Sequence, residues 1–253
     1  MGNHAPSRKA FPAMFHQPLS NVLITGGEVP RRVAVQGAIE ADGSIPLYRH
    51  PADKSPSLRP FTPTVALIAQ RVSAHLQHPV NHVLIQHYRS GADYISEHSD
   101  KTIDVVRDSS IVNVSLGAQR TMFLRTKRDA GPKQAQRVPL PDNSMFVLGL
   151  KSNRIWVHGI HTDNRPERIK DSKERGERIS LTFRWIGTFL TSDSKQIWGQ
   201  GATGKTREEA KPVVNGEKEA VPLIEAFGHE KRNSTFDWDA AYGDGYDVLH
   251  FNT

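Results

Sequence analysis

Two histidines and one aspartate offer the clearest chemistry in this sequence. His98 and Asp100 form a His-x-Asp unit, and residues two apart in an extended segment point to the same side, so both side chains can reach one ion. His158 follows within a second segment of strand-like pattern. Two histidines and one carboxylate form a facial triad for non-haem iron(II), which leaves the opposite coordination positions open. We therefore predict His98, Asp100 and His158 as metal ligands and catalytic residues.

A His-x-Asp unit alone is weak evidence, because the chain contains twelve histidines. A pair of surface side chains without a function is the default explanation of so short a motif. His161 also competes with His158 for the third ligand position, although it lies beyond the strand pattern. The prediction of a metal therefore depends on the rest of the sequence.

The segment 178–184 alternates strictly between polar and apolar residues, which indicates a strand. An edge strand with a solvated polar face is the simplest explanation. If the polar face instead points into a barrel, its arginines need an anionic guest, and a dicarboxylate such as 2-oxoglutarate fits a guanidinium fork. Such a strand is roughly 20 Å long, so one carboxylate can engage both arginines only if the strand bends or the side chains converge. We expect Arg178 to bind the distal carboxylate and Arg184 to support the site nearby.

Short strands must position these residues. Apolar residues at helical spacing predict a helix at 61–77, and strands are predicted at 82–88, 111–116, 121–125, 145–148, 154–160 and 178–186. Six strands without helices between them favour an antiparallel barrel or jelly roll. The predicted fold class is α+β but mainly β: a double-stranded β-helix (jelly roll, cupin-like) with flanking helices and a C-terminal extension.

Three regions differ in composition. Residues 1–60 are rich in Pro and Gly and are expected to form an irregular segment packed on the core. Residues 61–188 form the predicted β-helix core with its preceding helix. Residues 189–253 form an acidic, aromatic extension, which we interpret as a possible lid: from Gly201 onward, six Lys and Arg face ten Asp and Glu, whereas the whole chain carries +6.

Composition excludes several classes of protein. The chain has no cysteine, which excludes disulfides and thiolate metal sites. No apolar run is long enough for a membrane span, and the first residues lack the apolar block of a signal peptide. We expect an intracellular protein, cytoplasmic or nuclear, with no membrane partner. The sequence does not predict an oligomeric state.

Together these motifs resemble the AlkB family of iron(II)/2-oxoglutarate dioxygenases. The resemblance covers about residues 82–186 and rests on motifs in the family's order: Leu84, Ile85 and Tyr88; the His98–Asp100 unit; the run 115–118; Trp156 and His158; and the strand from Arg178 to Arg184. It implies an enzyme with Fe(II), 2-oxoglutarate and O2 as cofactors and cosubstrates. The implied cofactor-binding residues are Gln86, Tyr88, Arg178, Ser180, Thr182 and Arg184. The Pro-rich beginning and aromatic end resemble a filamentous-fungal branch, in which some relatives oxidise free amino acids in secondary metabolism.

Three departures from the family pattern concern recognition. Gln86 and Ser180 each replace an asparagine, and Thr102 stands where base-repair members carry an acidic residue that contacts the damaged base. These changes leave the implied iron chemistry intact, because none removes a ligand. They put base recognition in doubt.

The resemblance implies that decarboxylation of 2-oxoglutarate to succinate is coupled to oxidation of a substrate C–H bond. We favour a free small molecule, an amino acid or secondary metabolite that is hydroxylated or cyclised, because of Thr102 and the aromatic extension. The alternative is oxidative demethylation of alkylated bases in DNA or RNA. It is supported by a basic stretch at a predicted hairpin, comprising Arg120, Arg125, Lys127, Arg128, Lys133 and Arg137. A cupin-like binding module without enzymatic activity is a third, more distant possibility.

Overall fold

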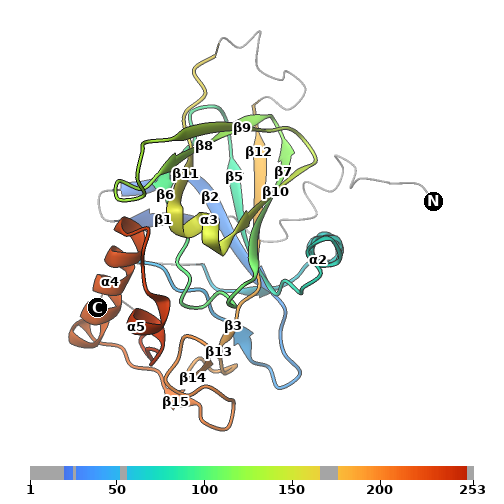
Figure 1. Ribbon diagram of the computed structural model, residues 1–253. Helices are drawn as coiled ribbons and strands as arrows, with labels where there is room; N and C mark the ends of the chain where they lie inside the picture. The colour runs from blue at the N-terminus through green and yellow to red at the C-terminus, as the bar shows by residue number, and fades with distance from the viewer. Residues whose placement is uncertain (1–19, 25–26, 52–55, 166–175, 250–253) are drawn as a thin grey trace.

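Two facing β-sheets form the centre of the computed structural model, which describes residues 20–24, 27–51, 56–165 and 176–249 (Figure 1). The seven-stranded sheet has the order β1-β2-β5-β12-β7-β10, with β4 paired to β2, and the four-stranded sheet has the order β6-β11-β8-β9. Nearly all of these pairings are antiparallel. The predicted double-stranded β-helix, or jelly roll, is confirmed.

The strands are short, as expected of a jelly roll. The larger sheet contains β1 (Ser20–Ile24), β2 (Gly27–Gly37), β4 (Arg59–Pro60), β5 (His82–Tyr88), β7 (Ser110–Gly117), β10 (Ser144–Gly149) and β12 (Arg178–Arg184). The smaller sheet contains β6 (Ile95–His98), β8 (Arg120–Thr126), β9 (Ala135–Leu140) and β11 (Trp156–Ile160). The larger sheet thus begins within residues 1–60, where β2 pairs with β5.

The strand β12 lies between β5 and β7, and its side chains point alternately to the two faces of the larger sheet. Its apolar side chains Ile179, Leu181 and Phe183 belong to the main hydrophobic core, together with buried residues of α2 (Pro63–Leu76). Its polar side chains point to the opposite face, toward the smaller sheet. The predicted alternation is therefore real, and its polar face lines the interior of the barrel.

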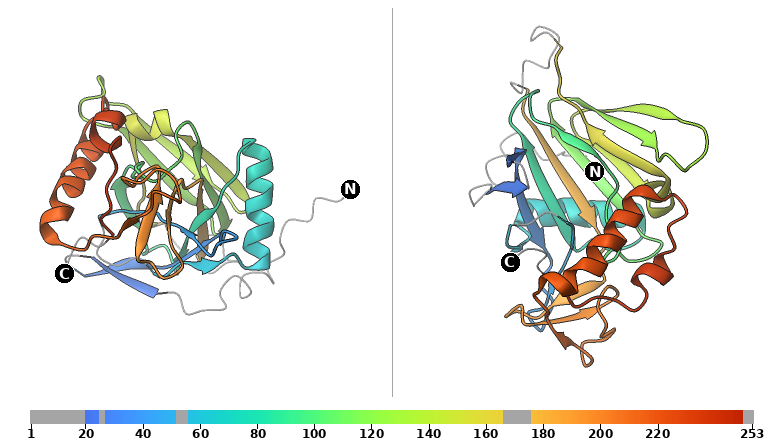
Figure 2. Two further views of the ribbon diagram at one scale, coloured as in Figure 1. Left: turned by 90° about the horizontal axis from the view of Figure 1, so that it is seen from below. Right: turned by 90° about the vertical axis from the view of Figure 1, so that its left-hand side faces the viewer.

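The C-terminal region contributes three strands to a small sheet, which β3 from the N-terminal region completes, and it also forms two helices. The sheet order is β15-β14-β13-β3, formed by β3 (Ile45–Pro46), β13 (Thr188–Leu190), β14 (Gln196–Gly199) and β15 (Lys211–Pro212). The helices α4 (Glu217–Arg232) and α5 (Trp238–Tyr242) lie on the side of the barrel opposite α2 (Figures 1 and 2). Within the described residues, no helix is long and apolar enough to cross a membrane.

The strand predicted at 154–160 differs from the structure at its beginning. Residues 154 and 155 end the short helix α3 (Leu150–Ile155), and β11 starts at Trp156. The helical turn buries Asn153, whose side chain hydrogen-bonds to the backbone of Asp100. A tertiary contact therefore outweighs the local strand pattern here.

Candidate active site

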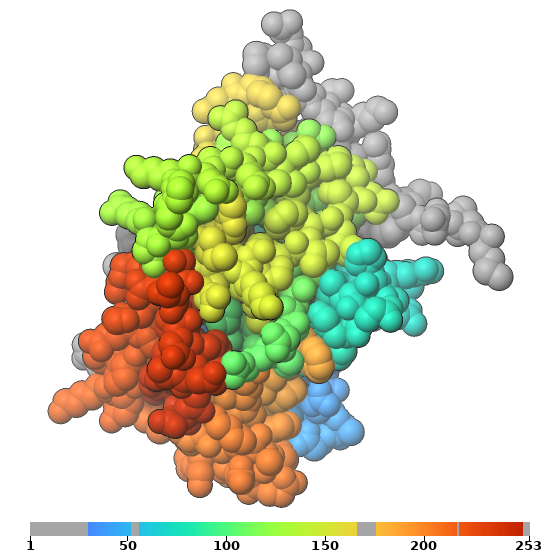
Figure 3. Space-filling view, viewed as in Figure 1, coloured from blue at the N-terminus to red at the C-terminus, as the bar shows by residue number. Residues whose placement is uncertain are grey.

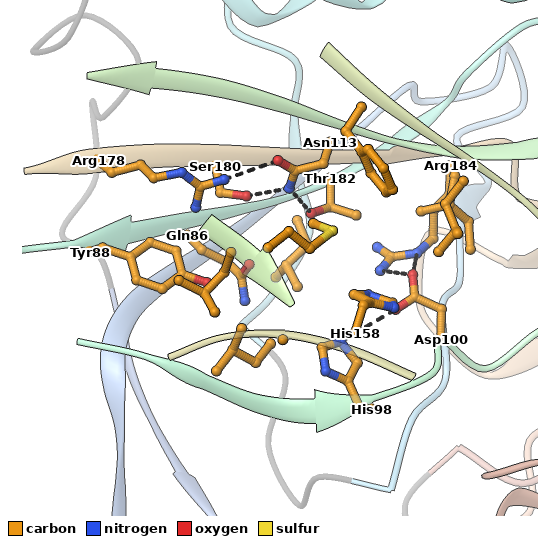
Figure 4. A pocket seen from close by; sticks show the side chains of 18 residues that line it. Gln86, Tyr88, His98, Asp100, Asn113, His158, Arg178, Ser180, Thr182 and Arg184 are labelled. Carbon is orange, nitrogen blue, oxygen red and sulfur yellow. Dashed lines mark hydrogen bonds and ion pairs between the residues drawn. The ribbon is translucent and has the colours of Figure 1, made fainter. Parts of the chain in front are cut away.

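Three potential metal ligands converge at one end of the barrel interior. His98 ends β6, and His158 on β11 is its antiparallel partner across the sheet. Asp100 follows two residues after β6, with Oδ1 3.6 Å from Nε2 of His98 and 4.0 Å from Nε2 of His158. One ligand atom of each residue lies within 4.8 Å of the other two. The structure thus brings together the predicted trio, as Figure 4 shows.

Neighbouring groups orient His98 and Asp100. Nδ1 of His98 lies 2.8 Å from the carbonyl oxygen of Ser96, so Nδ1 carries the proton and Nε2 is left to accept a metal. The backbone N–H and C=O of Asp100 both bond the side-chain amide of Asn153, at 2.9 Å each. Arg184 donates from Nε and Nη2 to Oδ2 of Asp100, at 3.0 and 2.6 Å. The Oδ1 atom of Asp100 therefore faces the histidines.

The protonation states of the trio match those that a metal requires. Burial lowers the pKa of His158 to about 3 and also lowers the pKa of His98, so both imidazoles are neutral near pH 7. Although burial opposes ionisation of Asp100, the Arg184 guanidinium and the two histidines hold its pKa well below the usual range. Two neutral imidazoles and one carboxylate are a donor set for a divalent metal.

His161, the competing candidate for the third ligand, lies outside this group. Its ring stacks on Phe123 with centroids 4.0 Å apart, and its Nε2 lies 3.8 Å from a carboxylate oxygen of Glu97. Strand alternation explains the difference, because His158 points into the barrel whereas His161 follows the end of β11.

Arg178 occupies the other end of the same cavity. Its side chain is buried, with 1% exposure, and its guanidinium lies 5.1 Å from the ring centroid of Tyr88. Nη2 donates to Oδ1 of Asn113 at 3.0 Å and to Oγ of Ser115 at 2.7 Å, but Nε and Nη1 have no partner among the described residues. A buried guanidinium with open donors is costly unless an anion satisfies it.

The other predicted cofactor residues line the wall between these two ends. Asn113 donates from Nδ2 to Oγ of Ser180 at 2.5 Å and to Oγ1 of Thr182 at 3.3 Å. Gln86 lies opposite Ser180 on the neighbouring strand, and its buried Nε2 has no partner among the described residues. Ser180, Thr182 and Gln86 thus present polar atoms along the path from Arg178 to the metal trio.

The sequence analysis missed two residues of this site. Asn113 bridges Arg178, Ser180 and Thr182, and Asn153 fixes the backbone of Asp100. Alternation along 111–116 could have revealed Asn113, since it shares a face with Ser115 in an otherwise apolar strand. No local pattern marks Asn153, because its partner is distant in sequence.

The empty space of the cavity, counted together with its opening to solvent, is about 550 Å³, and both of its ends are polar. Figure 4 shows Tyr88 and Arg178 at one end and the trio with Arg184 at the other. Apolar side chains complete the walls: Leu84, Ile95, Ile111, Met122, Phe146, Leu148 and Ile160. A metal at the trio and a dicarboxylate between it and Arg178 would satisfy the donor atoms at both ends.

A model of the 2OG-Fe(II) oxygenase superfamily matches residues 9–184, which is more than half of the chain. The chain belongs to this superfamily. The match includes the metal trio, the two arginines and the strands that carry them. Members of the superfamily are oxygenases that use Fe(II), 2-oxoglutarate and O2, as the donor set and the buried arginine indicated. The matched region ends at Arg184, before the C-terminal extension.

Relatives place the chain near AlkB-like proteins. It is 31% identical over 179 residues to a human protein, DNA oxidative demethylase ALKBH2, covering 68% of this chain and 63% of that protein. It is 26% identical over 175 residues to the uncharacterized protein R406 of Acanthamoeba polyphaga mimivirus, covering 68% of this chain and 83% of that protein. The solved structure of OsALKBH1 has 15% identity and a TM-score of 0.44, covering 70% of this chain and 88% of that one.

Proposed function

We propose that this oxygenase binds iron(II) through His98, Asp100 and His158 and removes methyl groups oxidatively from alkylated bases in nucleic acid. The chemistry is supported by the buried trio and by the unpaired donors of Arg178 at the far end of one cavity. The substrate class is supported by the human relative, which is a DNA oxidative demethylase, although the chain spans only 63% of that protein. The expected preference for a free small molecule gains no support from these relatives.

The bound cofactors supply an oxidant for an inert C–H bond, while O2 is consumed and 2-oxoglutarate becomes succinate and CO2. The protein's own residues prepare that chemistry. Arg178 and Tyr88 would bind the distal carboxylate of 2-oxoglutarate and so set the position of this molecule along the cavity. Arg184 neutralises Asp100 and holds its carboxylate in place. An oxidised N-methyl group becomes N-hydroxymethyl, which leaves as formaldehyde and restores the base.

Fewer basic side chains are exposed on the hairpin between β8 and β9 than the sequence suggested. Arg120 and Lys127 are buried and donate to backbone carbonyls, and Arg125 pairs with Glu97 at 2.6 Å. The solvent-facing cations that remain on the hairpin are Arg128, Lys133 and Arg137. We propose that these three contact the phosphates of a bound strand.

The test is turnover of a single-stranded oligonucleotide that carries an N-methylated base, measured by release of formaldehyde. Replacing Arg128, Lys133 and Arg137 with Ala should weaken binding and reduce the slope of log affinity against log salt by about 2, since each contact to a single strand contributes roughly 0.7. The control replaces Lys195, Lys211 and Lys218, exposed residues away from the hairpin, with the same change in charge. Equal effects from both triple variants would contradict the assigned phosphate contacts.

A free small molecule, the substrate class that the sequence analysis favoured, is the second candidate. One observation favours it: the hydroxyl of Thr102 donates to Glu230 and is buried, so this position offers no carboxylate to a base. If free amino acids stimulate succinate formation and methylated oligonucleotides do not, this second candidate is correct.

A further inference from the structure

The segment that follows Asp100 is held by the C-terminal extension. Ile103 is buried in one cluster with Leu223, Phe227 and Tyr242, all from the extension. In Figure 3 the C-terminal helices lie directly against the rest of the molecule, beneath the β8–β9 hairpin. These helices begin beyond residue 184, where the superfamily match ends. The contact is thus made by a part of the chain that the family match does not describe.

One carboxylate, that of Glu230 on α4, makes the central polar contact. Its Oε1 accepts hydrogen bonds from the backbone N–H of Thr102 at 3.0 Å and from the Thr102 hydroxyl at 2.5 Å. Its Oε2 accepts from Tyr242 at 2.9 Å and lies 3.8 Å from Nζ of Lys101. The side chain of Glu230 is only 5% exposed, and a buried carboxylate is retained only where such partners compensate the lost hydration.

The same two residues, Lys101 and Thr102, have further bonds to the extension. Nζ of Lys101 donates to the carbonyl oxygen of Phe227 at 2.6 Å, and Nε1 of Trp238 donates to the carbonyl oxygen of Thr102 at 3.2 Å. The backbone N–H, the C=O and the side chain of Thr102 are thus all bonded to α4 or α5. Asn153 fixes Asp100 itself from the other side.

We propose that Glu230 is a positioning residue for the metal: it fixes the backbone at Lys101 and Thr102 and thereby aims the carboxylate of Asp100 at the two histidines. Such outer partners orient a ligand without touching the ion. The proposal rests on the metal assignment at His98, Asp100 and His158, but it is independent of the substrate.

The experiment measures binding of Mn(II), with no cosubstrate, to the full chain by calorimetry, alongside thermal unfolding. Glu230→Ala should raise the Kd for Mn(II) about tenfold or more, the range typical of outer partners of metal ligands. Glu230→Gln keeps an oxygen that can accept from Thr102, so it should restore most of the affinity. Glu225→Gln, an exposed site on the same helix, should change nothing.

A stability control separates positioning from general loosening. Leu223→Ala opens the same hydrophobic cluster and should lower the Tm by about 10 °C without a comparable loss of Mn(II) affinity. If Glu230→Ala does not fold, Thr102→Val decides the matter, with a several-fold weaker affinity expected from the lost hydroxyl bond.

Unchanged affinity in a folded Glu230→Ala protein, or in Thr102→Val where Glu230→Ala does not fold, overturns the positioning role. An equal loss of affinity in Leu223→Ala also overturns it. Failure of the wild-type chain to bind Mn(II) would instead overturn the metal assignment.

Discussion

Two arginines on the same face of β12 illustrate how position determines what a residue type does. Arg184 stacks on Tyr48 with the guanidinium 4.1 Å from the ring centroid, and it donates twice to Asp100. Arg178, six residues earlier, keeps two buried donors without a partner among the described residues. Of the donor nitrogens of Arg184, Nε and Nη2 are bonded to Asp100 and only Nη1 has no partner among the described residues, whereas Arg178 leaves two donor nitrogens open to a ligand. Substitutions at the two positions should therefore have different consequences.

The largest effect is expected from Arg184→Ala, because it leaves the buried Asp100 carboxylate without its cation. Breaking a buried pair of this kind costs about 3–5 kcal/mol of folding free energy. Denaturant unfolding of the metal-free protein should show this loss. A stability close to that of the wild type would mean that Asp100 does not depend on Arg184.

Arg178→Ala should instead weaken the binding of 2-oxoglutarate and leave stability nearly unchanged. Removing it eliminates open buried donors, so stability should change little, but affinity for 2-oxoglutarate should fall roughly a hundredfold, the equivalent of about 3 kcal/mol. The rate of uncoupled succinate formation as a function of 2-oxoglutarate concentration gives the Michaelis constant. If Arg184→Ala and Arg178→Ala raise the Michaelis constant for 2-oxoglutarate equally, the distinction between the two arginines is wrong.

A smaller effect is expected from Asn113→Ala, which removes the bridge between Arg178 and the hydroxyls of Ser180 and Thr182. The loss of one orienting hydrogen bond is worth about 1 kcal/mol, or roughly fivefold in affinity. The same succinate assay measures it. A hundredfold loss would indicate that Asn113 contacts 2-oxoglutarate itself.

An effect of similar size, confined to acidic pH, is a difference in the pH dependence of stability near the Arg184 end. Burial, followed by the charge of Arg184, lowers the pKa of His82 to about 3. The unfolded chain takes up this proton near pH 6.5 but the folded chain does not. Stability from His82 is therefore complete above pH 6.5 and is lost as the pH falls toward 3. When the pH falls from 6.5 to 5.5, His82→Gln should lose about 1 kcal/mol less of its unfolding free energy than the wild type does. Denaturant unfolding at the two pH values measures this difference.

Much of the fold was predictable because its strands alternate. The strand at 82–88 matches β5 residue for residue, and the helix at 61–77 contains α2. In contrast, α4 has a proline inside it, Pro222, and low overall hydrophobicity, so local propensity gave no signal for it. Its burial depends on contacts with Lys101 and Ile103, which are distant in sequence.

The site was partly predictable for the same reason. His98 and Asp100 are two residues apart in sequence, and the arginines share one strand, so short-range spacing suggested them. The role of Arg184 beside Asp100 depends on a contact between residues 84 positions apart. The interpretation of residues 189–253 as a lid stays a prediction: the described residues that line the cavity all come from 84–184, while the extension packs behind Asp100.

The most direct test of the account compares two ligands of Mn(II)-loaded protein: 2-oxoglutarate and 2-oxopentanoate, which has the same carbon chain without the distal carboxylate. Wild-type protein should bind 2-oxoglutarate about a hundredfold more tightly, because only this ligand satisfies Arg178. Arg178→Ala should bind the two with similar affinity, and Arg184→Ala should still discriminate. If Arg178→Ala keeps the full preference for 2-oxoglutarate, the distal carboxylate lies elsewhere and the assignment of this cavity is wrong.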